Sequence, residues 1–440
     1  MHEIKQFTVE EFQHLINKSD LSNEFFNAFS CGNLRSVEVI ERDHAPIVEF
    51  KYELNKKNVV FRREFIMFDN TGTGATEFNF NFFPSGCNIS DQTDNCIIGD
   101  AKFAFFEKTS FESMSSSNNM NFEFTYFSGY TNFSGMLFAK DVCFLNSCFV
   151  NWVDFTEARF EGCAKFKMSQ FLEKNEFAGA WFLGETDFSR SRFLGDTSFW
   201  NSQFFNVVDF QYSHFFDKTD FHYLQFSADA DFTGSKFEKC AAFWESNFEA
   251  VDFSDSCFMC GVDFYRSQFE GNVNFKNSQF LNDANFRESK FLSTVDFKNS
   301  RFLNDADFQA SDFLGTVDFE GSQFSADMDF YGSQFSSNMN FVALFVGDRM
   351  NSESGSTVYF DDVKCLKNII IRTNSKYMIL VNSIVEGIMS IEDPLNSKDI
   401  IEKIDMTDMT VTGKLDICWG KKELQKKQCD LSQLIMKKQR

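Results

Sequence analysis

Phenylalanine recurs through the middle of this chain at intervals that alternate between five and six residues. The alternation is clearest in a series that consists of Phe297, Phe302, Phe308, Phe313, Phe319 and Phe324. It extends over about 122–341, with one ten-residue unit where Phe243, Phe248, Phe253 and Phe258 are each five apart. A chain of 440 residues with 63 phenylalanines has to bury most of these rings, and the eleven-residue period restricts how it does so.

The period of eleven excludes a helix for this region. In an α-helix a step of five residues rotates by roughly 140° and a step of six by roughly 240°, so the rings would point to different sides. An eleven-residue coiled coil keeps one apolar seam instead. The repeats are also rich in Asn, Ser and Gly, which are mediocre or poor helix formers. We therefore predict that each interval contains a short β-strand.

A second restricted position lies two residues before each phenylalanine, and these two side chains face the same side of an extended strand. The position alternates between serine and a small or medium apolar residue, as in Val295, Ser300, Ala306, Ser311, Val317 and Ser322. We predict four strands to a coil of 22 residues, with successive coils paired in parallel. Phe275, Phe297 and Phe319 would then stack in one column, with Phe286 and Phe308 in the opposite column. The short unit near Phe248 predicts a local irregularity in the stack.

These repeats resemble those of the pentapeptide-repeat family, whose unit is A-(D/N)-(L/F)-x-x. The matching segments include Val317-Asp318-Phe319-Glu320-Gly321, Ala306-Asp307-Phe308-Gln309-Ala310 and Ala230-Asp231-Phe232-Thr233-Gly234. The resemblance implies a right-handed parallel quadrilateral β-helix, here in an eleven-residue, phenylalanine-rich variant. The best-known relatives bind type II topoisomerases, which implies mimicry of a duplex phosphate backbone.

The remaining patterns divide the chain into four parts. We predict an N-terminal cap region of helices and strands over 1–98, the repeat β-helix over 99–345, and an irregular β-rich continuation or cap over 346–420. The basic segment 421–440 is predicted to be an amphipathic helix. Its apolar face would be formed by Leu424, Leu431, Leu434 and Ile435. This helix is expected to cap the last coil, to join two chains into a homodimer, or to do both.

The chain is acidic, with 64 Asp and Glu against 42 Lys and Arg and a net charge of −22. This charge argues against direct binding of nucleic-acid phosphates and favours a basic protein partner. No stretch is long and apolar enough to span a bilayer, and the first residues lack the apolar run of a signal peptide. The twelve cysteines are scattered, so we predict a cytoplasmic protein and interpret Cys257 and Cys260 as isolated thiols.

The clearest candidate site is a set of carboxylates that directly precede phenylalanines. Because neighbouring residues of a strand face opposite sides, these carboxylates are predicted to point outward in two ladders on opposite faces. The candidate residues are Asp252, Asp263, Asp296, Asp307, Asp318 and Asp329. The stretch from Phe302 to Gly347 also contains no Lys or Arg. The ladders are interpreted either as a binding surface or as a solvated face of residues that suit a position before a turn.

No sequence motif for catalysis, for a cofactor or for a metal site is found. We therefore predict a non-enzymatic binding protein without a cofactor. The first hypothesis is that the acidic β-helix engages a basic protein partner, such as a topoisomerase or another DNA-handling enzyme, by mimicking duplex DNA. The alternative is a structural scaffold or a recognition subunit of a larger assembly, such as a defence or host-interaction system.

Overall fold

The computed structural model describes a protein built from short β-strands. The described residues are 5–6, 34–40, 47–54, 57–64, 82–83, 105–106, 109–345 without 124 and 128, 357–392 without 374 and 376, 403–418, 429–430 and 435–436. These residues contain no helix. The chain divides into two units, one of residues 1–176 with 191–195 and one of residues 177–190 with 196–440.

The first unit contains a small sheet near the N-terminus. Strand β2 (Leu34–Ile40) pairs antiparallel with β3 (Ile47–Leu54), and β3 pairs antiparallel with β4 (Lys57–Glu64). The two-residue strand β1 (Lys5–Gln6) pairs in parallel with β4. These strands lie within the N-terminal cap region predicted over 1–98. The helices predicted before residue 47 fall largely outside the described residues.

The rest of the first unit is a series of coils. One coil contains β11 (Thr131–Asn132), β12 (Leu137–Phe138), β13 (Val142–Cys143) and β14 (Cys148–Phe149). Each strand pairs in parallel with the strand four places later. The four partner strands are β15 (Val153–Asp154), β16 (Arg159–Phe160), β17 (Ala164–Lys165) and β18 (Gln170–Phe171). The strands have two residues because a turn follows each phenylalanine or its equivalent.

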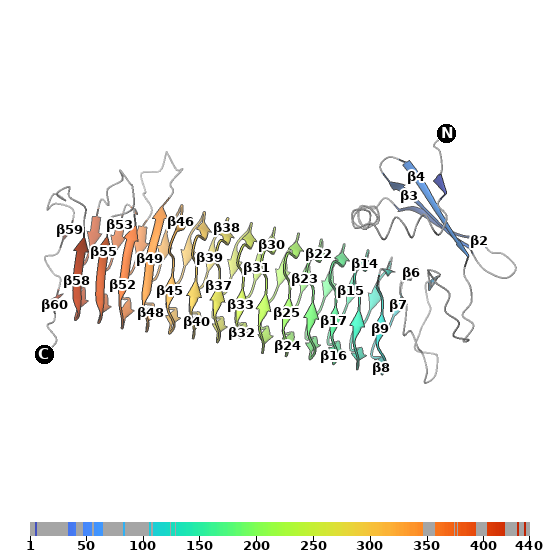
Figure 1. The fold of residues 1–440 in the computed structure, drawn as a ribbon, viewed down its shortest axis with the longest axis horizontal. Helices are drawn as coiled ribbons and strands as arrows, with labels where there is room; N and C mark the ends of the chain where they lie inside the picture. The colour runs from blue at the N-terminus through green and yellow to red at the C-terminus, as the bar shows by residue number, and fades with distance from the viewer. Residues whose placement is uncertain are drawn as a thin grey trace. The chain divides into compact units, whose positions relative to one another are not determined.

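The second unit repeats this arrangement over most of its length (Figure 1). One coil contains β33 (Val251–Asp252), β34 (Cys257–Phe258), β35 (Val262–Asp263) and β36 (Gln268–Phe269). The next contains β37 (Val273–Asn274), β38 (Gln279–Phe280), β39 (Ala284–Asn285) and β40 (Lys290–Phe291). Strands pair in parallel between coils, and Val273 lies opposite Val295, 22 residues later. The predicted all-β parallel solenoid is therefore confirmed.

The core of the second unit consists of stacked phenylalanine rings. The ring centroids of Phe275 and Phe297 are 5.0 Å apart and those of Phe297 and Phe319 are 4.7 Å apart, with nearly parallel planes. Phe286 stacks on Phe308 at 4.8 Å in a second column, two strands further along the coil, and it meets Phe275 edge to face at 5.5 Å. Phe297 has no exposed surface. The predicted columns are confirmed, and both ring geometries are favourable for aromatic pairs.

Most of the buried serines form hydrogen bonds to the coil before their own, whereas Ser278 and Ser300 donate to the phenylalanine carbonyl of their own turn. The Oγ of Ser311 donates to the carbonyl of Phe286 at 2.7 Å, and the Oγ of Ser322 donates to the carbonyl of Phe297 at 2.7 Å. Ser333 donates to Phe308 in the same way. A buried hydroxyl without a partner would be costly. Serine occurs here because its side chain is small and reaches a carbonyl of the preceding coil.

The turn after a phenylalanine requires an unusual backbone conformation at its third residue. The amide of Ser311 donates to the carbonyl of Phe308 at 3.2 Å and closes a four-residue turn. The residue before the serine has a positive φ, which is 53° at Ala310, 56° at Asn299 and 75° at Gly321. Glycine and asparagine tolerate this region, whereas alanine is strained in it.

The ten-residue unit is accommodated in a loop rather than in the core. Only two residues separate Phe248 from Val251, whereas three separate Phe226 from Ala230, and Val251 pairs with Ala230 21 residues earlier. Phe248 nevertheless stacks on Phe226 at 5.0 Å and on Phe269 at 4.9 Å. The predicted irregularity is therefore a shift of the register from 22 to 21 residues in the shorter connection, and the rings stay stacked with their planes 16° apart.

Parallel pairing continues beyond the phenylalanine repeats. Strand β47 (Met328–Asp329) pairs with β50 (Thr357–Tyr359), β48 (Gln334–Phe335) pairs with β51 (Lys364–Cys365), and β49 (Met339–Phe345) pairs with β52 (Ile369–Thr373). The strands that follow are β53 (Tyr377–Ile379), β54 (Ile384–Val385), β55 (Ile388–Glu392), β56 (Lys403–Asp405), β57 (Thr410–Val411) and β58 (Lys414–Cys418). Met378, Ile391 and Met406 are buried here in place of phenylalanines.

A helix over residues 421–440 is not supported. The described residues of this segment form two short strands, β59 (Cys429–Asp430) and β60 (Ile435–Met436). Strand β59 pairs with β56 and β60 pairs with β57, so both extend the parallel ladders. Ile435 therefore lies in a strand, because the available edge of the preceding coil supplies backbone partners that an isolated short helix lacks. Leu424, Leu431 and Leu434 fall outside the described residues.

Candidate interaction surface

The candidate carboxylates lie on two ladders in the second unit. The first, here called the β33 ladder, consists of Asp252, Asn274, Asp296, Asp318 and Asn340 on strands β33, β37, β41 (Val295–Asp296), β45 (Val317–Asp318) and β49. The second, here called the β35 ladder, consists of Asp263, Asn285, Asp307 and Asp329 on strands β35, β39, β43 (Ala306–Asp307) and β47. Parallel register therefore brings the predicted residues into two rows in different sheets.

Each carboxylate of the ladders has a local structural role. The Oδ1 atom of Asp307 accepts a hydrogen bond from the amide of Gln309 at 2.8 Å, and Oδ1 of Asp329 accepts one from the amide of Tyr331 at 2.8 Å. The same bond occurs at Asp252, Asp263, Asp296 and Asp318. Aspartate and asparagine favour such turns because their side chains bond to the backbone two residues later. All six side chains are half-buried.

Asparagines alternate with aspartates and reduce repulsion along the ladders. The Nδ2 atom of Asn285 donates to Oδ1 of Asp263 at 2.9 Å, and Nδ2 of Asn274 donates to Oδ2 of Asp252 at 2.9 Å. Asn340 donates to Asp318 at 3.0 Å. Like charges in directly opposed strand positions are destabilising. The amides replace that repulsion with hydrogen bonds between coils.

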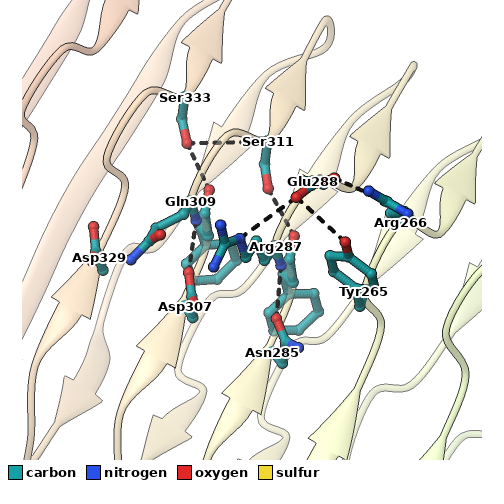
Figure 2. A network of polar contacts seen from close by, with 12 residues as sticks. Tyr265, Arg266, Asn285, Arg287, Glu288, Asp307, Gln309, Ser311, Asp329 and Ser333 are labelled. Atoms are coloured by element: carbon teal, nitrogen blue, oxygen red, sulfur yellow. Dashed lines mark hydrogen bonds and ion pairs between the residues drawn. The ribbon is translucent and has the colours of Figure 1, made fainter.

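Two aspartates meet directly at one point of each ladder. In the β35 ladder Asp307 precedes Asp329, and Nε2 of Gln309 bridges to Oδ2 of Asp329 at 2.6 Å (Figure 2). Burial, and secondarily the charge of Asp329, raise the pKa of Asp307 above its ordinary value. In the β33 ladder Nζ of Lys298 lies 3.0 Å from Oδ2 of Asp318. The β35 ladder therefore keeps adjacent carboxylates that a neutral amide bridges and on which Arg287 acts only weakly, whereas Lys298 forms an ion pair with Asp318 in the β33 ladder.

The carboxylates of the β35 ladder continue into a stretch without basic residues. The described part of this stretch, 302–343, contains no Lys or Arg and carries seven acidic residues, which are Asp305, Asp307, Asp312, Asp318, Glu320, Asp327 and Asp329. Lys298, from the preceding coil, reaches Asp318 and Glu320. These coils concentrate the negative charge of the chain.

Basic residues at the adjoining coils are held by a network around Glu288. The Nε atom of Arg266 donates to Oε2 of Glu288 at 2.8 Å, and the hydroxyl of Tyr265 donates to Oε1 at 3.4 Å (Figure 2). The guanidinium of Arg266 also lies 4.8 Å from the centre of the Tyr265 ring. The hydrogen bond from Arg266 lowers the pKa of Glu288. Sequence analysis missed this network, because each partner lies about one coil away and no short motif marks it.

The cysteine prediction needs correction. Cys260 pairs with Cys240 in a disulfide across a separation of 20 residues, with Cα atoms 4.9 Å apart, and Cys257 is a free thiol. Coil stacking brings Cys240 and Cys260 together, although the sequence places Cys260 closer to Cys257. Cys260 is therefore not an isolated thiol, whereas Cys257 is free as predicted, and the cytoplasmic location stays a prediction.

No other feature of the described residues adds a chemical site. Among them, no group of three or more His, Cys, Asp or Glu side chains is arranged to hold a metal ion. The described ranges also contain no helix with the length and apolar character needed to cross a membrane.

Comparison with known proteins supports the repeat. A family model described as pentapeptide repeats, in nine copies, matches residues 155–203, 258–301 and 286–334. No curated protein matches the chain. No solved structure matches it either.

Proposed function

Because the chain belongs to the pentapeptide-repeat family, we propose that it is a non-enzymatic binding protein whose acidic coils engage a basic protein partner. The observation that carries this proposal is the acidic stretch of the second unit. Seven carboxylates lie there without a Lys or Arg in the described residues 302–343. Complementary charge on a partner would increase its rate of association and favour it over acidic competitors.

Of the two ladders, the β35 ladder supports the proposal better. Asp307 and Asp329 stay next to each other although burial and the charge of Asp329 raise the pKa of Asp307, an effect that Arg287 opposes with a smaller contribution. In the β33 ladder, Asp318 already forms an ion pair with Lys298. A cation of the partner would relieve the repulsion between Asp307 and Asp329.

We further propose the form in which this surface is presented. Four strands in each coil support a right-handed helix with four sides, each side carrying one column of the core. Its ladders place one carboxylate or amide per coil, about 4.8 Å apart, whereas each DNA strand carries a phosphate about every 3.4 Å. Mimicry of duplex DNA would therefore be approximate, and it predicts competition with DNA for an enzyme such as a type II topoisomerase. An enzyme whose DNA binding is unaffected by the protein would argue against mimicry.

A scaffold or recognition subunit remains the second candidate, and one observation favours it. Ile370, Ile384 and Ile388 are exposed on the coils near the C-terminal end of the second unit. Exposed apolar residues at the end of a solenoid suit contact with another subunit, which includes a second copy of this chain. Concentration-dependent sedimentation of the parent protein and of an Ile384→Ser, Ile388→Ser variant tests this candidate.

The acidic-surface proposal is tested with two variants of equal charge. Asp307→Asn with Asp329→Asn changes the β35 ladder, and Asp296→Asn with Asp318→Asn changes the β33 ladder. Asparagine preserves the backbone hydrogen bond, so both variants should fold. We expect only the first pair to weaken binding of a short oligolysine peptide and to flatten its salt dependence. Equal binding by the parent and both variants at low and high salt would overturn the proposal.

A further inference from the structure

Aromatic side chains occupy one turn position in successive coils of the second unit. Strands β23 (Thr197–Ser198), β27 (Thr219–Asp220), β31 (Ala241–Ala242) and β35 pair in parallel one after another. The residue that follows each core phenylalanine of this column is therefore in register from coil to coil. These residues are Trp200, His222, Trp244 and Tyr265.

The rings form a connected surface, here called the aromatic strip, which consists of Trp200, His222, Tyr223 and Trp244. His222 stacks on Trp244 with centroids 4.4 Å apart and planes within 7°. Tyr223 meets Trp244 at 4.9 Å, and Trp200 lies 6.2 Å from His222. Trp200 is 45% exposed and Tyr223 is 42% exposed, so both present ring surface to solvent.

Carboxylates flank the aromatic strip. Asp220 contacts Nδ1 of His222, and Glu245 is hydrogen-bonded to Tyr223. Within the described residues, no Lys or Arg lies over the rings of Trp200, Tyr223 or Trp244. Aromatic rings beside carboxylates provide both a π face and a negative field, a combination that favours a planar cation.

The protein already uses this type of contact elsewhere on its coils. The guanidinium of Arg266 lies 4.8 Å from the centre of the Tyr265 ring, one coil beyond Trp244 (Figure 2). The guanidinium of Arg190 lies 5.9 Å from the Tyr212 ring. In the first unit, Nζ of Lys174 lies 5.1 Å from the Trp152 ring. Aromatic residues on these coils therefore accept cations from the same turn, as at Tyr265, or from the neighbouring coil, as at Tyr212 and Trp152.

We propose that the aromatic strip binds arginine side chains of an extended basic segment in a partner protein. The proposal rests on the proposed function and says which surface of the second unit the partner contacts. The β35 ladder begins at Asp263, on the strand that pairs with β31, so the aromatic strip and the ladder follow the same column of strands. Trp200 and Tyr223 would stack on guanidinium groups, while Asp220 and Glu245 neutralise them. The carboxylates of the β35 ladder would contact further basic residues of the same segment. Tryptophan, tyrosine and arginine are also the residues that dominate binding energy in protein interfaces.

The test compares two peptides of equal charge on the full chain by calorimetry. One peptide alternates arginine with serine and the other alternates lysine with serine. We expect the parent protein to prefer the arginine peptide, because guanidinium stacks on rings better than ammonium does. Trp200→Ala and Tyr223→Asn should each weaken arginine-peptide binding by about fivefold and lower the preference over lysine. Asparagine is chosen at position 223 because this residue has a positive φ of 57°.

A matched control distinguishes the strip from general loss of an aromatic residue. Trp181, in β20 (Trp181–Phe182), is 41% exposed and belongs to a different sheet, so Trp181→Ala should leave both affinities unchanged. Equal affinity of the parent for the two peptides, or equal losses in the Trp200 and Trp181 variants, would overturn the inference. If the strip variants lose arginine preference while the β35 ladder variants keep the parental salt dependence, the inference stands and the acidic-ladder proposal fails.

Discussion

At the scale of single residues, the turn position before each buried serine determines local strain. Ala310 has a φ of 53° there, whereas glycine occupies the position at Gly321 and Gly332. The left-handed region costs a non-glycine residue about 1–2 kcal/mol, and glycine loses about 0.4–1 kcal/mol through its more flexible unfolded state. We expect Ala310→Gly to raise the free energy of unfolding by about 0.5–1 kcal/mol. Urea denaturation measures this change.

The control for this prediction is an alanine outside the left-handed region. Ala242 lies in β31 and is half-buried. Ala242→Gly should lower the free energy of unfolding by about 0.5–1 kcal/mol, because glycine weakens a strand. If the free energy of unfolding changes in the same direction in both variants, the effect of glycine does not depend on φ, and the prediction is contradicted.

At the scale of the strand and its coil, a core phenylalanine stabilises through both of its stacked neighbours. Phe297 stacks on Phe275 and Phe319 and meets Phe286 and Phe308 edge to face. Truncation to alanine leaves a cavity that rigid neighbouring coils fill poorly, so Phe297→Ala should cost about 3–5 kcal/mol. Phe205, which is 42% exposed, is the control, and Phe205→Ala should cost well under half as much. Denaturation midpoints that shift equally would contradict the stacked core.

The cross-link between coils leads to a second prediction at this scale. Cys240 and Cys260 close a loop over a separation of 20 residues. A loop of this size corresponds to about 3 kcal/mol of stabilisation through the unfolded state. Adding a reductant should therefore lower the unfolding midpoint of the parent protein, whereas a variant with Cys240→Ser and Cys260→Ser should be insensitive. A parent protein whose midpoint ignores the reductant would show that the bond contributes nothing.

Sequence predicted the periodic elements well because each phenylalanine repeats the same constraint. Phe275, Phe297 and Phe319 follow from spacing alone, and so does the parallel register that aligns Asp307 with Asp329. The sequence did not predict contacts between residues that lie about one coil apart and whose residue types do not repeat. Arg266 with Glu288, and Cys240 with Cys260, are examples. The short connection after Phe248 shifts the register but leaves the rings stacked, because loops absorb a change in length that a packed core does not.

At the scale of the whole molecule, three half-buried carboxylates predict a pH dependence. Burial raises the pKa of Asp263, Asp307 and Asp361 above the ordinary value of 3.8. A raised pKa means that the folded state binds protons more tightly than the unfolded state, so stability increases as pH falls toward that value. These three groups should therefore raise the thermal unfolding midpoint as pH falls toward 3.8.

The sign of this dependence has an internal control. Glu288 has a lowered pKa, so its contribution is lost only as pH falls below its ordinary value of 4.5. It does not oppose the rise in the window above that value. A variant with Asn at positions 263, 307 and 361 should show a flatter profile than the parent. A midpoint that falls steadily from pH 7 to pH 5 in the parent would contradict the assignment.

The repeat also predicts that the length of a deletion matters less than its register. Removing 295–316 deletes one coil of 22 residues and joins Thr294 to Val317, which already lies opposite Val295 in the same ladder. Stability in a solenoid is roughly a sum over coils and their contacts, so the shortened protein should remain folded with reduced stability. Removing only 300–305 is a smaller change. It places Ala306 where the buried Ser300 lies, and it shifts every later strand by one position in the four-strand coil, into a different column. The buried serines after the deletion would lose their alignment with phenylalanine carbonyls of the preceding coil, and unpaired buried hydroxyls are costly. Circular dichroism and urea denaturation should show a cooperative transition for the 22-residue deletion and a broadened or absent one for the six-residue deletion. The reverse ranking would contradict the register derived from the phenylalanine spacing.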